Sequence, residues 1–396
     1  FCGGKRMNLK VEDLCSHLVQ IKSTSGGEKE IVDFLKDLFT QMGFDEINID
    51  RYGSIVAVMR GERPGKKLLF DSHIDTVGIP KLEDWTKDPF GGQIEDGRVY
   101  GRGCSDMKGP MAAAISGVEA FVRKNSRDFA GEILISGVVH EECFEGVAAR
   151  EISQRYQPDY VIICETTDLK LNYGQRGRME VSIETIGKPC HSSSPEKGIN
   201  AVYHMAQVIP ELRKIELDSD PDLGPAILEL VDICSEPYPG ASVIPARCRA
   251  TYDVRTLTTD SADSILARIN EVLDRLSQRI PDFKASASLV ESSEVCYTGE
   301  TITAERFFPA WKSDPESTES LAILSAMEKA GLPPSKSVYS FCTNGSHYGG
   351  EAGLTVYGFG PSQETQCHMD DEYIEISQLE KAAEVYQNIC ENLLSL

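Results

Sequence analysis

Apolar side chains at helical spacing predict that the chain opens with helices. Within Leu9–Met42 they recur every three or four residues, as at Ile31 and Leu35. A polar, glycine-containing stretch, Ser23–Gly27, interrupts the pattern, and Gly43 follows its last residue, as is common after the final turn of a helix. We therefore predict two helical pieces joined by a short break.

Short runs rich in apolar residues alternate with further helical patterns and predict strands. The strand runs are Ile47–Ile49, Ser54–Val58, Lys67–Phe70, Gly97–Tyr100, Gly131–Val139, Tyr160–Cys164 and Leu354–Gly358. A turn is predicted at Arg63–Gly65, just before the third run. Helical patterns cover Met107–Lys124, Ser317–Ala330 and Ile376–Leu394. This alternation indicates an α/β domain with an open, mostly parallel sheet, whose sites lie at the carboxyl ends of the strands.

The middle of the chain has a different order of elements. Its pattern reads β-α-β-β-α-β, over Met179–Ile186, Ile199–Ile215, Ala226–Ile233, Arg247–Val254, Ala262–Arg279 and Ala285–Val290. This order is typical of a ferredoxin-like α+β unit. We predict a discontinuous α/β domain formed by residues 1–177 and 297–396, with residues 178–296 inserted as a second domain.

Composition and charge exclude several classes of protein. The 396 residues are enough for two domains with large cores. The formal net charge of −22, without a cluster of Lys and Arg, argues against a nucleic-acid or anionic-membrane partner. No apolar run is long enough to span a bilayer, and no signal peptide is visible. Twelve scattered cysteines without a C-x-x-C pair exclude a zinc ribbon and indicate the cytoplasm.

Polar residues follow three of the buried strands. Residues two apart in extended chain face the same side, so His73 and Asp75 suit an imidazole oriented by a carboxylate. In His140–Glu142 the two acids would point opposite ways, one toward a metal and the other toward a water. Glu165 follows the next strand. The first two features have ordinary alternatives: a surface histidine for the His73–Asp75 pair, and a solvated loop for the two adjacent acids.

Asp106 lies at a predicted strand-to-helix turn, where three interpretations compete. It could cap the helix, or the preceding glycines Gly101 and Gly103 could form a nucleotide loop. The second interpretation is disfavoured because an acid stands where a dinucleotide fingerprint requires its third glycine, and it would repel a pyrophosphate. The third interpretation is a metal ligand, which requires other ligands elsewhere in the chain.

The rest of the α/β domain supplies such ligands. Two imidazoles and three carboxylates occupy predicted loops: His73, Asp106, Glu142, Glu165 and His368. This set suits two divalent ions bridged by one carboxylate, with Zn²⁺ favoured and Co²⁺ or Mn²⁺ possible as substitutes. Asp106 is the predicted bridge. Glu141, beside a ligand, is the predicted general base for a water activated between the two ions.

At this point the chain resembles the M20 metallopeptidases, over nearly its whole length. The resemblance rests on Phe70–Val77, Tyr100–Gly109, His140–Glu142, Gly187–Pro195 with Gly198–Ala201, and Cys367–His368 before Asp371–Tyr373, which occur in family order. That family contains acetylornithine deacetylase, succinyl-diaminopimelate desuccinylase, glutamate carboxypeptidase and aminoacylases.

The resemblance implies roles for individual residues. One metal would take His73, Asp106 and Glu165, and the other Asp106, Glu142 and His368. Further implied roles are Glu141 as general base, Asp75 as the acid behind His73, and His191 as the lid histidine that polarises the scissile carbonyl. The inserted domain would be a lid that often carries a dimer interface, so a homodimer is expected, and His191 could act in the other subunit. The Asp106–Met107 peptide is expected to be cis.

Departures from the family pattern concern the substrate. Ser242–Pro245 and Asn344 stand where relatives often have Asn-Val-Ile-Pro and an Asp. Arg255 matches an arginine that can hold a substrate carboxylate, with a structural ion pair as the alternative.

The sequence therefore predicts a two-metal hydrolase that cleaves an amide bond of a small N-acyl amino acid. A dipeptidase or carboxypeptidase is the alternative within this class, and an inactive binding scaffold is a distant third. The chain has no H-E-x-x-H, G-x-S-x-G or Walker motif, which excludes the hydrolases that those motifs define.

Overall fold

The protein folds into two compact units in a computed structural model that describes residues 10–396. The first unit comprises the chain through Gln175, together with Ser293–Ile302 and Lys312–Leu396. The second comprises Arg176–Ser292 and Thr303–Trp311. The segment Thr303–Trp311 thus belongs to the second unit although it follows the return to the first domain predicted at residue 297. Of the first predicted helix, Leu9 lies outside the described residues.

A mixed nine-stranded sheet forms the centre of the first unit. Its order is β1-β2-β6-β3-β7-β20-β8-β18, with β19 paired to β8. The four middle strands, β6, β3, β7 and β20, are parallel, as the alternating pattern predicts. The strands are β1 (Glu46–Ile49), β2 (Ile55–Arg60), β3 (Arg63–His73), β6 (Ala130–Val138), β7 (Tyr160–Ile163), β8 (Leu171–Gln175), β18 (Trp311–Lys312), β19 (Lys336–Tyr339) and β20 (Thr355–Gly358).

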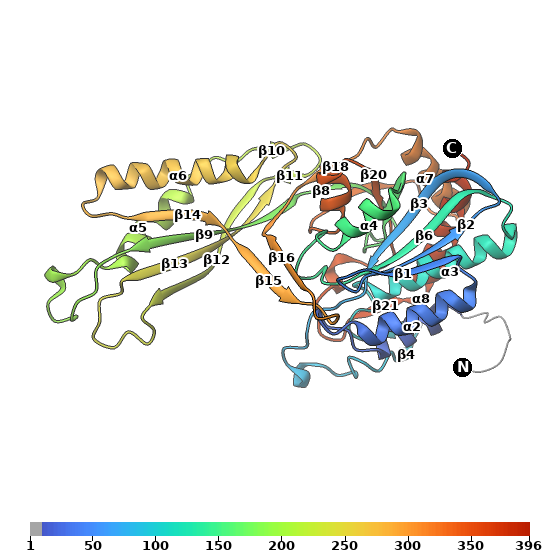
Figure 1. The fold of residues 1–396 in the computed structure, drawn as a ribbon, viewed down its shortest axis with the longest axis horizontal. Helices are drawn as coiled ribbons and strands as arrows, with labels where there is room; N and C mark the ends of the chain where they lie inside the picture. Colours follow the sequence, from blue (N-terminus) through green and yellow to red (C-terminus); the bar gives the residue numbers. More distant parts are fainter. Residues whose placement is uncertain (1–9) are drawn as a thin grey trace. The chain divides into compact units, whose positions relative to one another are not determined.

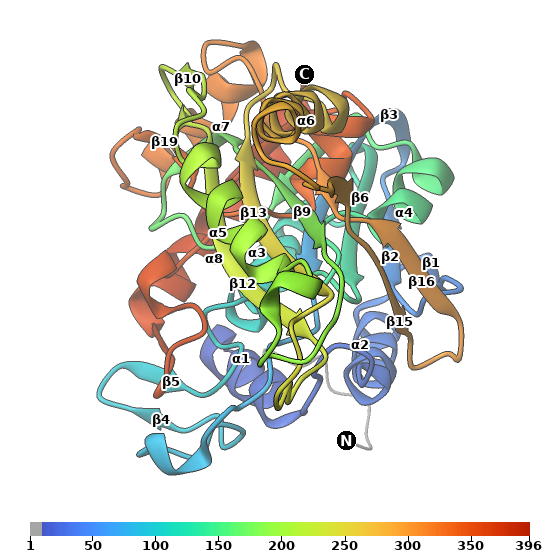
Figure 2. The same ribbon diagram turned by 90° about the vertical axis from the view of Figure 1, so that its left-hand side faces the viewer.

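Helices cover both faces of this sheet. They are α1 (Val11–Gln20), α2 (Lys29–Met42), α3 (Lys108–Asn125), α4 (Ala149–Tyr156), α7 (Thr318–Lys329) and α8 (Ile376–Leu393). Short 3-10 helices lie at Leu82–Asp84 and Glu364–Gln366, and a π-helix lies at Ser346–Glu351. In the strand order, the connection from β3 through α3 to β6 steps toward β1, whereas the connection from β6 through α4 to β7 steps toward β18. Because such crossovers are right-handed, α3 and α4 lie on opposite faces (Figure 2). α8 packs on α3 and α7.

The parallel register brings three strand ends to one edge. His73 pairs with Val138 at the end of β6, and Asp71 pairs with Ile163 at the end of β7. The segments that follow β3, β6 and β7 therefore start side by side. This register is the reason that a histidine from one loop and glutamates from two others meet in space.

Two local predictions are corrected by strand pairing. Arg63–Gly65, predicted as a turn, is the start of β3, because Arg63 pairs with Ala130 before a register irregularity that ends at Lys67. A small sheet of order β21-β5-β4 was only partly predicted, from Gly97–Tyr100. It joins β4 (Ile94–Glu95), β5 (Arg98–Tyr100) and β21 (Tyr373–Glu375).

The second unit contains an antiparallel sheet of order β12-β13-β9-β14, with β17 beside β9. Its elements are β9 (Gly177–Ile186), α5 (Ala201–Leu212), β12 (Ile227–Glu236), β13 (Arg247–Thr256), α6 (Ala262–Arg279), β14 (Ala285–Leu289) and β17 (Phe307–Phe308), with short pieces at Pro195–Lys197, β10 (Ser219–Asp220) and β11 (Gly224–Pro225). Figure 1 shows α5 and α6 on the same face of this sheet. Alternate residues of β9, such as Met179, Val181 and Ile183, pack beneath them. A hairpin of β15 (Glu291–Val295) and β16 (Thr301–Glu305) follows.

Helix α6 begins with a capping box. The Ser261 hydroxyl accepts a hydrogen bond from Ser264 N, and Ser261 N donates to the Ser264 hydroxyl. Replacing Ser261 with alanine should therefore destabilise the protein by about 1 kcal/mol, and lower its Tm by a few degrees in a thermal melt followed by circular dichroism. Ser277→Ala, inside the same helix, serves as the control. An equal fall in Tm for both variants would contradict the contribution of the cap.

No helix in the described part of the chain has the length and apolar character needed to cross a membrane. The eleven cysteines within residues 10–396 form no disulfide.

Candidate metal centre

His73, the last residue of β3, is almost fully buried. Its Nδ1 lies 2.9 Å from the main-chain oxygen of Asp75, to which it can donate a hydrogen bond. The Asp75 carboxylate, predicted to orient the ring, lies 3.7 Å from Nδ1 and accepts hydrogen bonds from Glu141 N, Glu142 N and the Ser25 hydroxyl. Donation from Nδ1 leaves Nε2 as the nitrogen that can bind a metal.

Asp106 precedes α3 but does not cap it. Met107 occupies the N-cap position, where no side chain makes a capping hydrogen bond, so the capping interpretation is wrong. The main-chain N–H groups of Gly103, Ser105 and Asp106 donate to the carboxylate of Glu372, which leaves none of the three for a nucleotide phosphate. The Asp106–Met107 peptide is cis, as predicted.

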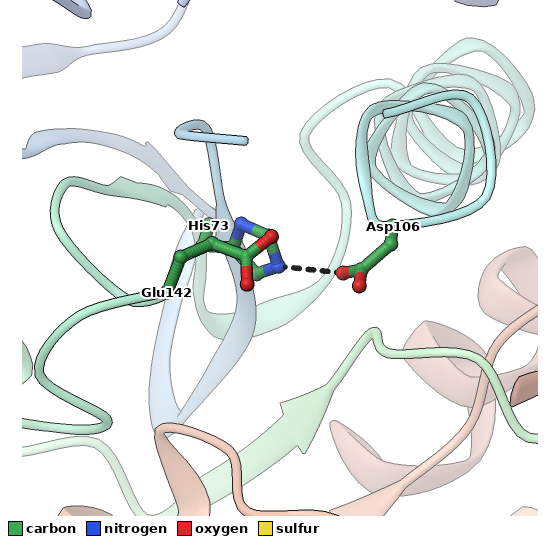
Figure 3. A group of neighbouring side chains, drawn as sticks. All are labelled: His73, Asp106 and Glu142. Atoms are coloured by element: carbon green, nitrogen blue, oxygen red, sulfur yellow. Dashed lines mark hydrogen bonds and ion pairs between the residues drawn. The ribbon is translucent and has the colours of Figure 1, made fainter. Parts of the chain in front are cut away.

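The two oxygens of Asp106 face two different imidazoles. Oδ1 lies 2.9 Å from His73 Nε2, and Oδ2 lies 3.2 Å from His368 Nε2. Figure 3 shows the side chains of His73, Asp106 and Glu142 converging from the end of β3, the turn before α3 and the loop after β6. A carboxylate whose oxygens face opposite nitrogens has the geometry of a bridging ligand.

The loop after β6 brings both of its acids to the site. The extended geometry predicted for His140–Glu142 is wrong, because the chain turns at His140, where φ is +56°, and Phe144 N bonds back to the His140 oxygen. Glu141 Oε2 therefore lies 3.9 Å from His73 Nε2, while Glu142 Oε2 lies 3.0 Å from His368 Nε2. The turn, rather than alternation along a strand, gives the two acids different neighbours.

Glu165 completes the cluster from the end of β7. Its Oε1 lies 3.3 Å from His73 Nε2, and the residue is almost fully buried. Ligand atoms that lie within 4.8 Å of one another form two candidate metal groups among the described residues: His73, Asp106 and Glu142, and His73, Glu141 and Glu165. Within the second group Glu165 lies nearer to the imidazole than Glu141 does.

Burial and crowding shift the pKa values of these groups. Hydrogen bonds to Asp106 and Glu142 raise the pKa of His368 to about 10. Burial, reinforced by the Asp106 charge, raises the pKa of Glu142 to about 7, and burial also raises the pKa of Glu141. Burial disfavours ionisation of Asp106, but hydrogen bonds from His368 and His73 outweigh it and hold its pKa below the usual range. Several carboxylates are thus buried close to one another with little positive charge nearby to stabilise their ionised forms.

The donor set fits divalent cations. Glu141 Oε1 and Glu165 Oε2 are buried oxygens without a hydrogen-bond partner in the described part of the chain. A buried carboxylate oxygen in that state is costly unless a proton or a cation compensates it. Imidazole nitrogen together with carboxylate oxygen is the ligand chemistry of Zn²⁺ and, less selectively, of neighbouring divalent ions.

Three other residues predicted from the sequence have hydrogen-bond partners outside this cluster. His191 belongs to the second unit, where its Nδ1 accepts from Ser193 N. Arg255, on β13, donates from Nε to Asp253 at 3.0 Å, so the alternative ion pair is present. Asn344 is 2% exposed, donates to Asp71 and accepts from the main chain of the loop after β6.

Two buried acids near the site were assigned no function from the sequence. Asp71, which lies two residues before His73, accepts hydrogen bonds from Ser136, Asn344 and Tyr348. Glu372 binds the turn before Asp106. The only sequence feature that could have pointed to these two acids is their position within the segments that carry the family resemblance.

Comparison with known proteins identifies the family. Residues 69–392 match the profile of peptidase family M20/M25/M40. The chain belongs to this family, and it is a metal-dependent hydrolase, as the sequence predicts.

Relatives and a solved structure match over nearly the whole chain. Uncharacterized protein YgeY of Escherichia coli (strain K12) is 31% identical over 381 residues, covering 94% of this chain and 91% of its own. The succinyl-diaminopimelate desuccinylase of Cereibacter sphaeroides (strain ATCC 17029 / ATH 2.4.9) is 26% identical over 386 residues, covering 95% and 97%. The crystal structure of aminopeptidase PepT from Bacillus cereus ATCC 10987 has a TM-score of 0.75 at 19% identity, with 98% of both chains covered, which shows a shared fold.

Proposed function

We propose that the protein is a two-metal amidohydrolase that cleaves the amide bond of a small N-acyl amino acid. The observation that supports it most directly is the pair of imidazoles, His73 and His368, facing opposite oxygens of Asp106. With Glu165 beside one imidazole and Glu142 beside the other, each side has three donors. The proposed ligand sets are His73, Asp106 and Glu165, and Asp106, Glu142 and His368.

The chain's own side chains divide the chemistry. Bound divalent ions would supply Lewis acidity, which makes water nucleophilic near neutral pH and stabilises developing negative charge. Glu141 takes the proton of the attacking water and delivers it to the leaving amine. Its position favours this role, because Glu141 is buried 3.9 Å from His73 Nε2 and its other oxygen has no hydrogen-bond partner among the described residues. Asp75 fixes the base by accepting from its main-chain N–H.

A relative matched over nearly the whole chain supports the proposed substrate class. The desuccinylase relative is named for removing a succinyl group, so an acyl group is proposed on the amino side of the scissile bond. Aminopeptidase PepT, which shares the fold, represents the alternative, a peptidase.

A substrate panel tests the choice. We expect kcat/KM to be highest for N-succinyl or N-acetyl amino acids, and lower for dipeptides with a free amino terminus. N-acetylated dipeptides serve as the matched set, because they differ from the free dipeptides only by the acyl group. Faster turnover of free dipeptides than of every acylated substrate would contradict the deacylase proposal and leave the peptidase.

Two ions per chain are expected in metal-replete protein, with zinc as the favoured metal. His368→Ala removes a ligand of one proposed ion only, so it should retain about one ion per chain, while wild type retains two. Elemental analysis after removal of loosely bound metal checks both numbers. At most one ion in wild type would contradict the two-metal proposal.

Several further roles belong to this proposal. Arg255 would hold a substrate carboxylate through the guanidinium nitrogens that do not bind Asp253. Asn344 would help to shape the substrate site, since its side-chain amide donates a hydrogen bond to Asp71. His191 would polarise the scissile carbonyl, and the second unit would act as a lid and dimer contact.

The absence of disulfides among residues 10–396 supports the predicted cytoplasmic location.

A further inference from the structure

Glu372 joins the two loops that carry Asp106 and His368. It lies four residues after His368, just before β21, and is completely buried. β21 pairs with β5, the strand that leads into the Asp106 turn. Neither the general base nor the proposed ligands include this acid, so its function is unassigned.

Its carboxylate collects the N–H groups of the Asp106 turn. Oε1 accepts from Ser105 N at 2.8 Å, and from Gly103 N and Asp106 N at 3.1 Å. Oε2 accepts from Gly103 N at 3.1 Å and from Arg102 Nη1 at 2.8 Å. Successive N–H groups directed at one point form a concavity that binds anions, and here the anion is a side chain of the protein itself.

The turn is shaped for this contact. Gly103 has a φ of +86°, and a Cβ there would approach Thr76 Cγ2 to 2.8 Å, so the site requires glycine. Arg102 and Glu372 form an ion pair with side chains 2% and 0% exposed. The same guanidinium nitrogen donates to the main-chain oxygen of Met369, next to His368.

These contacts constrain both sides of the proposed two-metal site. The hydrogen bond to Asp106 N fixes the main chain from which that carboxylate projects toward His73 and His368. The bonds through Arg102 to Met369 fix the loop that carries His368. Glu372 thus acts on the proposed ligands indirectly, through the main chain of the Asp106 turn and through Arg102.

We propose that Glu372 is a positioning residue that sets metal affinity by holding Asp106 as a bridge. This rests on the proposed function. Loss of an outer partner of a metal ligand typically weakens metal binding by about 10–100-fold. Glu372→Gln keeps the size of the side chain but removes the charge and places an NH₂ group against N–H donors. Glu372→Asp keeps the charge and should restore part of the affinity.

The test measures zinc occupancy as a function of free zinc. Full-length, zinc-replete wild type, Glu372→Gln and Glu372→Asp are dialysed against chelator-buffered zinc, and bound ions are counted by elemental analysis. Glu375→Gln is the matched control, because Glu375 is a part-exposed acid on β21 that pairs with Arg98. For Glu372→Gln, we expect half-occupancy at about 10–100-fold higher free zinc, an intermediate value for Glu372→Asp, and no change in the control.

Two further readouts separate positioning from a purely structural role. At saturating zinc, Glu372→Gln should regain its second ion and a native near-ultraviolet circular dichroism spectrum. A lower Tm with wild-type zinc affinity would overturn the proposal, as would equal zinc affinities in all four proteins. If Glu372→Gln does not fold, Glu372→Asp decides by the same comparison. Fewer than two ions in wild type would instead contradict the two-metal function itself.

Discussion

Glu141→Ala is expected to retain both metal ions and to lose about 10²–10⁴-fold in kcat, the range that general acid–base catalysis contributes. The expectation rests on position. Glu141 is 5% exposed, one of its oxygens has no hydrogen-bond partner in the described residues, and the other lies 3.9 Å from His73 Nε2. It is close enough to the cluster to serve a water there. Glu165 and Glu142 lie nearer to the imidazoles, and both proposed ligands remain in the variant.

Steady-state kinetics and metal analysis on the same samples provide the measurement. Glu141→Gln keeps the shape of the side chain and should lose activity similarly, since an amide does not accept a proton at neutral pH. Glu151→Ala, which removes a part-exposed acid paired with Arg51, is the control and should behave as wild type. Near-wild-type turnover of Glu141→Ala would refute the role of the base, and parallel loss of metal and activity would make Glu141 a ligand.

The central sheet was predictable because its strands are short apolar runs separated by helical patterns. β6 and β7 were placed to within a residue or two at each end, and the order of elements in the second unit follows the predicted β-α-β-β-α-β pattern. Pairing between distant segments left weaker signals. Arg63 joins β3 through a contact with Ala130, and Phe307 joins the second unit by pairing with Met179 of β9. Neither contact follows from local periodicity.

The site could be predicted from the sequence where a polar residue stands at the end of a buried strand. His73 and Glu165 follow this rule, since β3 and β7 end at the same edge. The orientation of Glu141 and Glu142 was not predictable, because it depends on a turn held by main-chain donors bound to Asp75. Glu372 was missed for a related reason. Apart from Arg102, its partners are main-chain N–H groups far away in the sequence, which any residue type can supply.

His191→Ala is expected to lower kcat by about 10²–10³-fold with metal content unchanged, the effect of removing one donor aimed at a developing oxyanion. His191 belongs to the second unit, whereas the proposed ligands all belong to the first, so metal binding should not depend on it. Its Nδ1 accepts a hydrogen bond from Ser193 N at 3.1 Å, which places the hydrogen of the neutral ring on Nε2. That N–H is the donor that the role requires.

Main-chain contacts hold the loop around His191. His191 forms an isolated antiparallel β-bridge with Val243, and Ser192 N donates a hydrogen bond to Ser242 O. The loop that carries His191 and the segment Ser242–Pro245 therefore stabilise each other. Ser193→Ala leaves the main-chain donor in place and should lose much less activity than His191→Ala. Loss of metal from His191→Ala, or unchanged kcat, would contradict the donor role.

The resemblance further implies that this histidine can serve the site of a partner subunit, and mixing two inactive variants tests that expectation. A heterodimer of Glu141→Ala and His191→Ala chains would contain one site with both residues intact if His191 acts across subunits. Activity should then recover to about half that of wild type per heterodimer, because one of two sites is restored. If His191 acts within its own chain, every site lacks one of the two residues. Heterodimers isolated through two different affinity tags, with no recovered activity, would therefore exclude action across the subunits.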